Sequence, residues 1–382
     1  MKGFSLHTKK NTADYCFIEA DPRYRLSKFE RLTMTGGEDL EKALGWAAKQ
    51  FSNFSYTDQL DNLNLNIPEL TEISRFYSND VFRKNPASFF KRVDSLVQVE
   101  LNPVHGLKDG EIFDIRFASS YQPQYPGFEA EYNRYEENKF VNARYWKHRD
   151  HARPTMIAIH GWAMGDQRIN SLVFLPGYFY HLGMDVVLFE LPYHGRRKPK
   201  VAGDEFLFPS TNVVRTNEAM AQSICDLRQI ERFLRSLGAN IIGAAGMSLG
   251  GYTASLWASL DYLSFCIPIV PMASMAEMCW DILSKEKKLD DLKNVGLSRE
   301  LLNDVYHLHS PLSFEPKIKP DHAMIIAGLG DAIVPPRHPK MLWEHWRYPD
   351  LTWFSGGHIA QLKRSEAFYK IVDFFRKLQF ID

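Results

Sequence analysis

Five short, continuous runs of apolar residues, spaced along the chain from residue 155 onward, constrain its fold more than any other feature. They are TMIAIH (155–160), DVVLFE (185–190), IIGAAG (241–246), FCIPIV (265–270) and AMIIAG (323–328). Runs of this length suit central strands of a parallel sheet that is buried on both faces. Because helical segments separate them, the pattern predicts right-handed crossovers onto a mostly parallel sheet.

Further elements extend this pattern on both sides. EIFDIRF (111–117) and KFVNARYW (139–146) alternate as half-buried strands do, and LTWF (351–354) is the expected last strand. Between residues 217 and 237, apolar side chains recur every three or four positions, and Gly238 follows. That spacing predicts an amphipathic helix with a glycine at its C-terminal end. The fold class expected is therefore α/β, with helices flanking the sheet.

The residues before about position 105 have a different texture. We expect a helical N-terminal extension over 1–105, followed by a single domain over 106–382. The helical pieces expected in the extension cover 38–51, 68–77 and 87–97. Residues 276–320 interrupt the alternation of strand and helix with the charged stretch SKEKKLDDLK and the helix-like SRELLNDVYHLH. We interpret them as a small cap insertion over one end of the sheet.

Composition excludes several classes of protein. Lysine plus arginine and aspartate plus glutamate both number 46, so the formal net charge is zero. Such a chain lacks the broad basic footprint of a nucleic-acid binder, and no nucleic-acid partner is expected. Its four cysteines are widely spaced without a CxxC pair, which indicates neither a disulfide framework nor a zinc site. That usage fits a reducing cytosol, and the N-terminus has no apolar core of a signal peptide, so we expect a cytoplasmic protein.

One stretch could be mistaken for a membrane span, because between Ile241 and Met275 the only charged residue is Asp261. A transmembrane helix needs about 20 continuous apolar residues. Glycines and prolines divide this stretch into shorter pieces, which predicts a strand, a turn, a helix and a second strand instead. No transmembrane segment is expected.

The pentapeptide Gly246-Met247-Ser248-Leu249-Gly250 lies where an apolar run ends and a helical one begins. A serine on a sharp strand-to-helix turn is lifted clear of the sheet, and small residues are needed two positions before and after it. The helix N-terminus that follows favours negative charge beside the serine. We therefore predict that Ser248 is a catalytic nucleophile.

A serine nucleophile needs a base, and the base needs an orienting carboxylate. Asp331 follows a buried strand in Gly328-Leu329-Gly330-Asp331, and His358 follows the last strand in a glycine-flanked loop. The order Ser, Asp, His and the position of each after a strand match this architecture. Glu277, just beyond the 265–270 strand, is the alternative acid.

The oxyanion hole requires backbone N–H groups where charge develops on the carbonyl oxygen. Leu249, the residue after the nucleophile, is one expected donor. The second is expected from the loop after the 155–160 strand, with Trp162 preferred and Ala163 the alternative. His160 is interpreted as a structural residue of that turn.

At this point the chain resembles the α/β-hydrolase superfamily of serine hydrolases. HGW (160–162), GMSLG (246–250), GLGDAIVPP (328–336) and GGHIA (356–360) match it in order and spacing, from about residue 110 to the end. More narrowly, LPYHGRRKP (191–199) and GMSLGGYTAS (246–255) resemble the branch named α/β-hydrolase domain-containing protein 18. The resemblance implies the α/β-hydrolase fold and carries the triad onto Ser248, Asp331 and His358.

Weaker signals remain. The densest basic run, His194 to Lys200, follows the 185–190 strand, and in it Arg196 or Arg197 could contact an anionic substrate group. A solvated loop is the simpler reading of that run. Two histidine pairs lack the further ligands of a metal site, so no metal and no cofactor are expected. They are His307 with His309, and His148 with His151.

The leading hypothesis is a cofactor-independent serine hydrolase that cleaves a carboxylic ester, an acyl lipid among the candidates, through an acyl-enzyme. The same triad would serve a peptidase, a thioesterase or an acyltransferase, because fold and triad do not set the substrate. The alternative from another class is a binding protein that kept the fold without catalysis. The expected partner is a small-molecule or lipid-like ester, and the sequence indicates no oligomeric state.

Overall fold

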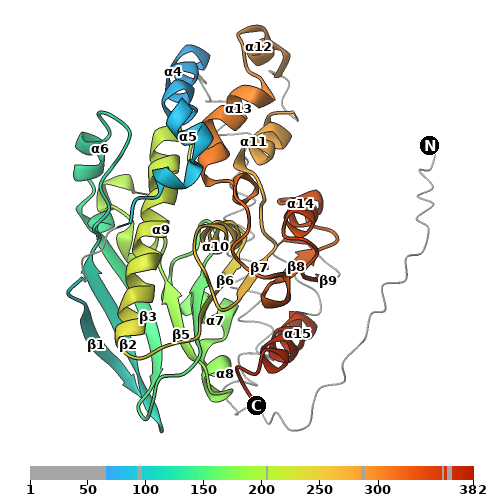
Figure 1. Ribbon diagram of the computed structural model, residues 1–382. Helices are drawn as coiled ribbons and strands as arrows, with labels where there is room; N and C mark the ends of the chain where they lie inside the picture. The colour runs from blue at the N-terminus through green and yellow to red at the C-terminus, as the bar shows by residue number, and fades with distance from the viewer. Residues whose placement is uncertain (1–65, 93–96, 204, 285–288, 355–356, 359–363) are drawn as a thin grey trace, which may run out of the picture.

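A nine-stranded sheet forms the centre of the part of the chain that the structure describes. The structure is a computed structural model that describes residues 66–92, 97–203, 205–284, 289–354, 357–358 and 364–382. The strand order is β1-β2-β3-β5-β4-β6-β7-β8-β9, and Figure 1 shows its strong twist. The strands are β1 (Glu100–Gly106), β2 (Gly110–Ala118), β3 (Phe140–His148), β4 (Thr155–Ile159), β5 (Asp185–Phe189), β6 (Ile242–Met247), β7 (Cys266–Ile269), β8 (Met324–Gly328) and β9 (Asp350–Phe354).

The pairing is mixed, with a long parallel part. The pairs that run from β5 through β4, β6, β7 and β8 to β9 are all parallel. The strands β1, β2 and β3 pair antiparallel, and β3 joins β5 antiparallel. Every residue of β4, β5 and β8 is buried, which is why these strands have continuous apolar sequences. This arrangement confirms the expected α/β-hydrolase fold, a mostly parallel sheet flanked by helices.

Helices cover both faces of the sheet. Those of the main layers are α7 (Gln167–Phe174), α8 (Pro176–His181), α9 (Val213–Ser236), α10 (Leu249–Leu260), α14 (Arg337–His345) and α15 (Arg364–Lys377). Alternate residues of β4 contribute to two separate cores. Ile157 and Ile159 pack with residues of α9, α10 and α14, whereas Met156 and Ala158 pack with residues of α8 and α15. The alternation follows from the two-residue period of a strand.

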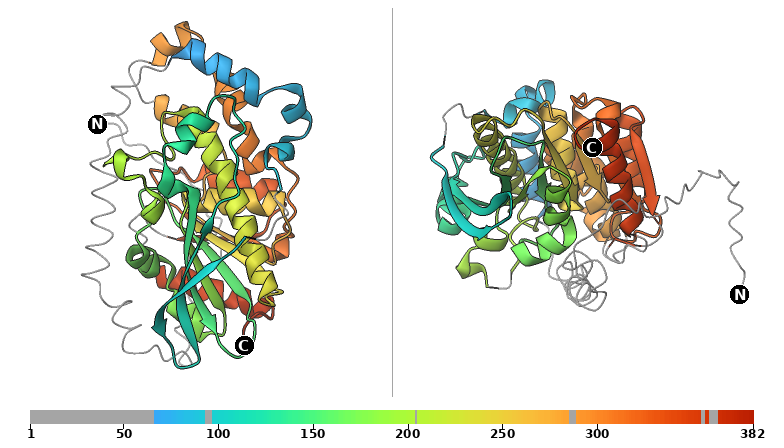
Figure 2. Two further views of the ribbon diagram at one scale, coloured as in Figure 1. Left: turned by 90° about the vertical axis from the view of Figure 1, so that its left-hand side faces the viewer. Right: turned by 90° about the horizontal axis from the view of Figure 1, so that it is seen from below.

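The remaining helices gather at one end of the molecule. Between β7 and β8 the chain forms α11 (Met275–Leu283), α12 (Leu289–Asn294) and α13 (Arg299–Tyr306), at the position of the expected cap insertion. From the N-terminal part, α4 (Ile67–Tyr77) packs on α13, and α5 (Asp80–Lys84) follows it. Both figures of the ribbon place the blue α4 and α5 beside the orange helices (Figures 1 and 2).

Short 3₁₀ helices complete the description. They are η1 (Pro86–Phe89), η2 (Glu136–Lys139), η3 (Gly195–Arg197), η4 (Lys200–Ala202), η5 (His307–His309), η6 (Pro311–Ser313) and η7 (Pro320–His322), and α6 (Glu129–Asn133) is a single short α-helix before β3. None of the helices in the described ranges combines the length and the apolarity needed to cross a bilayer. The stretch 241–275 instead forms β6, α10 and β7, as its glycines and prolines predict.

The structure corrects the N-terminal boundary. The strand β1 lies within the expected extension, which therefore ends before residue 100, and pairs with β2 at the edge of the sheet. Its residues are almost all exposed, so its sequence lacks the apolar alternation that would have predicted a strand. Pro103 is tolerated because the strand lies at the edge of the sheet. The helix expected at 38–51 lies outside the described residues.

Two helices also differ in length from expectation. In place of a helix over 87–97, the chain forms only the short η1, and residues 93–96 are not described. Phe89 and Phe90 are adjacent in the sequence and both are buried. Phe89 makes an edge contact with Tyr77, and Phe90 makes one with Phe314. An amphipathic surface helix buries a single stripe of side chains, which does not accommodate two consecutive residues. The helix α9 begins four residues before the expected 217, because the Asn212 side chain caps it by accepting from the Arg215 N–H.

Candidate active site

The sharp turn between β6 and α10 carries Ser248. Its backbone has φ 56° and ψ −115°, a conformation that costs energy for any residue with a side chain. A Cβ added to Gly246 would collide with the Gly250 carbonyl oxygen, and a Cβ on Gly250 would collide with that of Ile159. The GxSxG spacing therefore has a steric cause, since the turn presses against itself and against the end of β4.

Three side chains from separate loops meet at this turn. The His358 Nε2 atom lies 2.8 Å from the Ser248 hydroxyl oxygen. On the other side of the ring, His358 Nδ1 lies 2.7 Å from Asp331 Oδ2. All three side chains are buried, with Ser248 the most accessible at 8%. Because a carboxylate only accepts hydrogen bonds, Nδ1 donates to Asp331, and Nε2 is left to accept from the serine.

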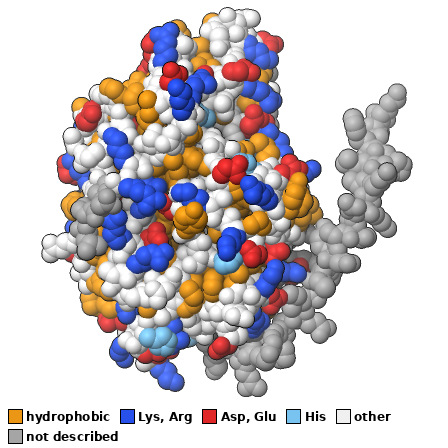
Figure 3. Space-filling view, viewed as in Figure 1, with side chains coloured by type: hydrophobic (Ala, Val, Ile, Leu, Met, Phe, Trp, Pro, Cys, Tyr) orange, Lys and Arg blue, Asp and Glu red, His pale blue; other side chains and the backbone are white. Residues whose placement is uncertain are grey.

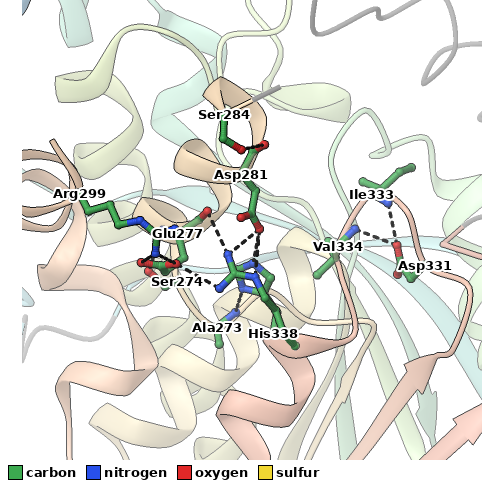
Figure 4. Close-up of polar contacts among 11 residues, drawn as sticks. Ala273, Ser274, Glu277, Asp281, Ser284, Arg299, Asp331, Ile333, Val334 and His338 are labelled. Atoms are coloured by element: carbon green, nitrogen blue, oxygen red, sulfur yellow. Dashed lines mark hydrogen bonds and ion pairs between the residues drawn. The ribbon is translucent and has the colours of Figure 1, made fainter. Parts of the chain in front are cut away.

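The carboxylate of Asp331 is itself held in place. Its second oxygen, Oδ1, accepts from the backbone N–H groups of Ile333 and Val334 at 3.0 and 2.8 Å, as Figure 4 shows. The loop after β8 thus folds around the aspartate and aims the other oxygen at the histidine. A carboxylate held by two backbone donors is fixed in orientation.

The alternative acid, Glu277, is occupied elsewhere. It lies on α11, where its carboxylate forms ion pairs with Arg299 and Arg337, each at 3.1 Å. Figure 4 shows these contacts, together with Asp281, apart from the loop of Asp331. Glu277 therefore links α11 to α13 and α14, and Asp331 is the carboxylate that contacts His358.

The expected oxyanion donors lie on the two loops that flank the serine. Leu249 is the first residue of α10 and is buried, so its N–H belongs to the first turn, whose N–H groups have no partner within the helix. The loop after β4 also approaches closely, since a Cβ on Gly161 would lie 3.5 Å from the Ser248 Cβ. Trp162 follows directly and Ala163 takes φ 60°, which turns the chain away.

His160 is a structural residue of this loop in the structure. Its Nε2 accepts from the Leu191 N–H at 3.1 Å, and its Nδ1 lies 2.8 Å from the Gly161 carbonyl oxygen, to which it donates. Burial, reinforced by the charge of neighbouring groups, lowers the pKa of His160 from 6.5 to about 3. The ring therefore stays neutral with a fixed tautomer at physiological pH.

The structure contradicts the predicted anion contact for Arg197, whereas for Arg196, whose side chain is 37% exposed, the contact stays a prediction. Arg197 is fully buried and pairs with Asp226 at 2.7 Å, so a substrate cannot reach it. Arg196 pairs with Glu190 at 2.8 Å and with Asp114 at 2.9 Å. A run of basic letters in the sequence does not reveal such partners, because the carboxylates come from other elements. On the face that Figure 3 shows, basic and acidic side chains are likewise interspersed.

The histidine pairs considered for metal binding have other contacts. His309 bonds to the Tyr252 hydroxyl at 2.7 Å and to the Asn217 amide oxygen at 3.0 Å. His148 lies 2.8 Å from Asp185. Within the described ranges, no three His, Cys, Asp or Glu side chains gather in a way that could hold a metal ion.

Sequence reasoning overlooked Glu190 and Gln167, which lie beside the loop after β4. The Gln167 amide donates to the Glu190 carboxylate at 2.7 Å, and both side chains are buried. Glu190 is the charged residue that closes the apolar run 185–190. A charge directly after a fully buried strand is the signal that could have identified it, because a buried carboxylate requires partners.

With this geometry established, comparison with known proteins places the chain in a family. Residues 68–284 match the family model described as alpha/beta hydrolase domain containing 18. Uncharacterized proteins from two strains of Mycobacterium tuberculosis are 31% identical over 294 residues, which cover 75% of this chain and 68% of theirs.

Solved structures show the same fold at low sequence identity. Acetyl xylan esterase 1 from a Thermoanaerobacterium species superposes with a TM-score of 0.58 at 14% identity, covering 84% of this chain and all of that one. An acetyl xylan esterase from a Paenibacillus species gives 0.56 at 17% identity, covering 77% of this chain and 93% of that one. At this identity the likeness shows the α/β-hydrolase fold, whose function has to be argued from the site.

Proposed function

The chain belongs to the family named alpha/beta hydrolase domain containing 18, and on that premise we propose that it is a serine hydrolase that cleaves carboxylic esters through an acyl-enzyme. The observation that carries the proposal is the continuous hydrogen-bonded line from Ser248 through His358 to Asp331, with distances of 2.8 and 2.7 Å. A hydroxyl that is hydrogen-bonded to an imidazole, which in turn is hydrogen-bonded to a fixed carboxylate, is the arrangement that turns serine into a nucleophile.

In the first half of the reaction, the Ser248 oxygen attacks the ester carbonyl carbon while its proton passes to His358 Nε2. Asp331 holds the ring so that Nε2 faces the serine, and its charge stabilises the imidazolium that forms. The tetrahedral intermediate collapses, and the alcohol leaves with the proton from Nε2. In the second half, a water molecule gives a proton to Nε2 as its oxygen attacks the acyl carbon. Nε2 then returns the proton to the Ser248 oxygen as the acyl–oxygen bond breaks and the acid leaves.

The negative charge that develops on the carbonyl oxygen needs donors already in place. We assign this role to the N–H groups of Leu249 and Trp162. The close approach of the loop after β4 to the Ser248 Cβ supports this assignment, as does the position of Leu249 at the N-terminus of α10. The helix dipole there adds to the stabilisation of an anion.

A substrate of the carboxylic ester class is supported by the fold, since both structures cited above are named acetyl xylan esterases. A panel of p-nitrophenyl esters of increasing chain length, measured beside a thioester and an aminoacyl amide, tests the class. Fastest turnover of the oxygen esters is expected. Faster turnover of the thioester or the amide would replace the proposal with a thioesterase or a peptidase, and transfer to an added alcohol in place of hydrolysis would indicate an acyltransferase.

The nucleophile has a direct test. A fluorophosphonate probe should label the wild-type protein and fail to label Ser248→Ala. Labelling also depends on the base, so His358→Ala should react slowly. Equal labelling of the wild type and Ser248→Ala would refute the nucleophile, and absence of labelling and of turnover in the wild type would favour a non-catalytic binding protein.

A further inference from the structure

We propose that Glu190 is a positioning residue that clamps the oxyanion loop (160–166) in its working place. This inference rests on the proposed function. It gives a role to the loop after β5 (190–197), which carries Arg196 and the buried Arg197. The strands β4 and β5 are parallel neighbours, so their two following loops leave the sheet at the same edge.

The Glu190 carboxylate joins these loops through three hydrogen bonds. Its Oε1 accepts from the Gln167 side-chain amide at 2.7 Å and from Arg196 Nε at 2.8 Å. Its Oε2 accepts from the Arg196 backbone N–H at 2.8 Å. Glu190 is fully buried, and a buried charge with three good partners is costly to disturb.

Gln167 is the first residue of α7, directly after the oxyanion loop. In the described part of the chain, its amide oxygen has no hydrogen-bond partner, so the bond to Glu190 is the one that fixes this side chain. The carboxylate therefore holds the C-terminal end of the oxyanion loop.

The same two loops also touch backbone to backbone. A Cβ on Gly165 would lie 2.5 Å from the Gly195 nitrogen, and a Cβ on Gly195 would lie 2.5 Å from the Gly165 oxygen. A Cβ on Gly195 would in addition lie 2.8 Å from Glu190 Oε2. Only glycines permit this contact, which holds Glu190 against both loops.

The opposite end of the oxyanion loop is held by the neighbouring residue. Leu191 donates its N–H to His160 Nε2, and His160 Nδ1 donates to the Gly161 carbonyl oxygen. That carbonyl belongs to the same planar peptide unit as the Trp162 N–H, so its direction sets the direction of the donor. Glu190 and Leu191 thus hold the loop at its two ends.

The test compares Glu190→Gln and Gln167→Leu with the wild type. An amide at position 190 must turn its NH₂ group toward a donor that the carboxylate accepted, and Gln167→Leu removes the bond to the loop. Both should lower kcat by about tenfold or more with KM changed less than about twofold, because oxyanion donors act on the transition state. Affinity for a boronic acid transition-state analogue should fall by the same factor as kcat/KM.

Asp114→Asn is the matched control. Asp114 is the other carboxylate partner of Arg196 but lies on β2, away from the oxyanion loop. It should lower the melting temperature yet leave kcat and analogue affinity unchanged. A merely structural role of Glu190 would produce the same pattern in Glu190→Gln, and this result would overturn the proposal.

The experiments distinguish failure of the proposed function from failure of the proposed role of Glu190. Turnover retained by Ser248→Ala would refute the proposed function. If Ser248→Ala is inactive while Glu190→Gln and Gln167→Leu keep the wild-type kcat and analogue affinity, only the clamp is refuted. Should Glu190→Gln fail to fold, Gln167→Leu decides the matter alone, because it keeps the buried charge paired with Arg196.

Discussion

At the scale of single residues, each group of the proposed site is fixed by a contact on the side that faces away from the reacting atoms. Ser248 is held by a strained turn, and His358 by Asp331. Asp331 in turn is held by two backbone N–H groups. Each fixed group removes freedom from the next, so little reorganisation is left for the reaction itself. Substitutions that keep the shape and remove one of these restraints should therefore act on turnover more than on binding.

Asp331→Asn should lower kcat by about a thousandfold or more, because the amide can present its NH₂ group to His358 and favour the wrong tautomer. KM should change little, since Asp331 does not contact the substrate. Steady-state kinetics with the best p-nitrophenyl ester provides the measurement. Glu277→Gln is the control and should retain activity; if it were the variant that lost turnover, Glu277 would be the acid.

Gly250→Ala should abolish activity and destabilise the protein, because the new methyl group meets the Ile159 carbonyl oxygen. Overpacking of this kind costs about 1–3 kcal/mol or more. Gly177→Ala is the matched control, since nothing lies within 4 Å of the added Cβ there. It lies in the first turn of α8, and alanine should be neutral or slightly stabilising. Urea unfolding and esterase activity test both, and a stable, active Gly250→Ala would contradict the steric account.

At the scale of secondary-structure elements, neighbouring strands decide which loops can cooperate. The strand β4 lies between β5 and β6, which puts the oxyanion loop between the nucleophile turn and the loop after β5. The latter is anchored again by Arg197, whose guanidinium reaches Asp226 on α9 and the Asn138 carbonyl oxygen. Arg197 thus connects the loop after β5 to the helix α9 and to η2, and it does so from a buried position.

Arg197→Met should lower the free energy of unfolding by about 3–5 kcal/mol, because it leaves the buried Asp226 carboxylate without its cation. Burial already raises the pKa of Asp226 above its ordinary value. Removing the cation would therefore make the ionised form of Asp226 still less stable in the folded protein. Arg347→Met, which breaks an exposed pair with Glu315, should cost little. Chemical denaturation measures both. A stable Arg197→Met with a raised KM for anionic esters would restore the substrate-anion role.

At the scale of the whole molecule, polar groups are buried deep in a chain without net charge. Burial lowers the pKa of His309 to about 3 and that of His338 to about 4. It raises the pKa of Asp185, Glu218 and Asp226 above their ordinary values. The histidines and the carboxylates have opposite effects on stability in acid. The folded state resists protonation of these histidines, which lowers stability as the pH falls, and favours protonation of these carboxylates, which raises it.

His338 isolates one of these contributions. It is fully buried, and its Nδ1 accepts from the Ala273 N–H, while Asp281, Glu277 and Arg337 surround it. Between pH 6.5 and about 4, the unfolded chain binds a proton here that the native state does not, so this contribution to stability falls as the pH falls. The loss approaches about 3 kcal/mol for the shift from 6.5 to about 4.

His338→Gln should therefore be less acid-sensitive than the wild type. Its destabilisation relative to the wild type should be largest at pH 7 and should shrink by roughly 3 kcal/mol toward pH 4. Urea unfolding across this range provides the measurement. A difference between the two proteins that stays constant with pH would show that His338 does not resist protonation in the folded state.

Local sequence patterns determined the strands, the sharp turn at Ser248 and the chain order of the three residues proposed as a triad. Buried parallel strands need continuous apolar residues, and the tight turn at Ser248 needs glycines on both sides. Both requirements concern residues that are close together in the sequence, so they can be recognised from the sequence alone. The edge strand β1 was missed for the same reason, because exposed residues carry no such requirement.

Tertiary structure alone decided how charged residues are used. Asp331 rather than Glu277 contacts His358, and Arg197 meets a carboxylate on α9. Glu190 reaches the oxyanion loop because β4 and β5 are neighbours. A charge is stabilised by whichever partner lies within a few ångströms, and that partner can come from any part of the chain. The sequence determined which residues can do the chemistry, and the fold determined which of them meet.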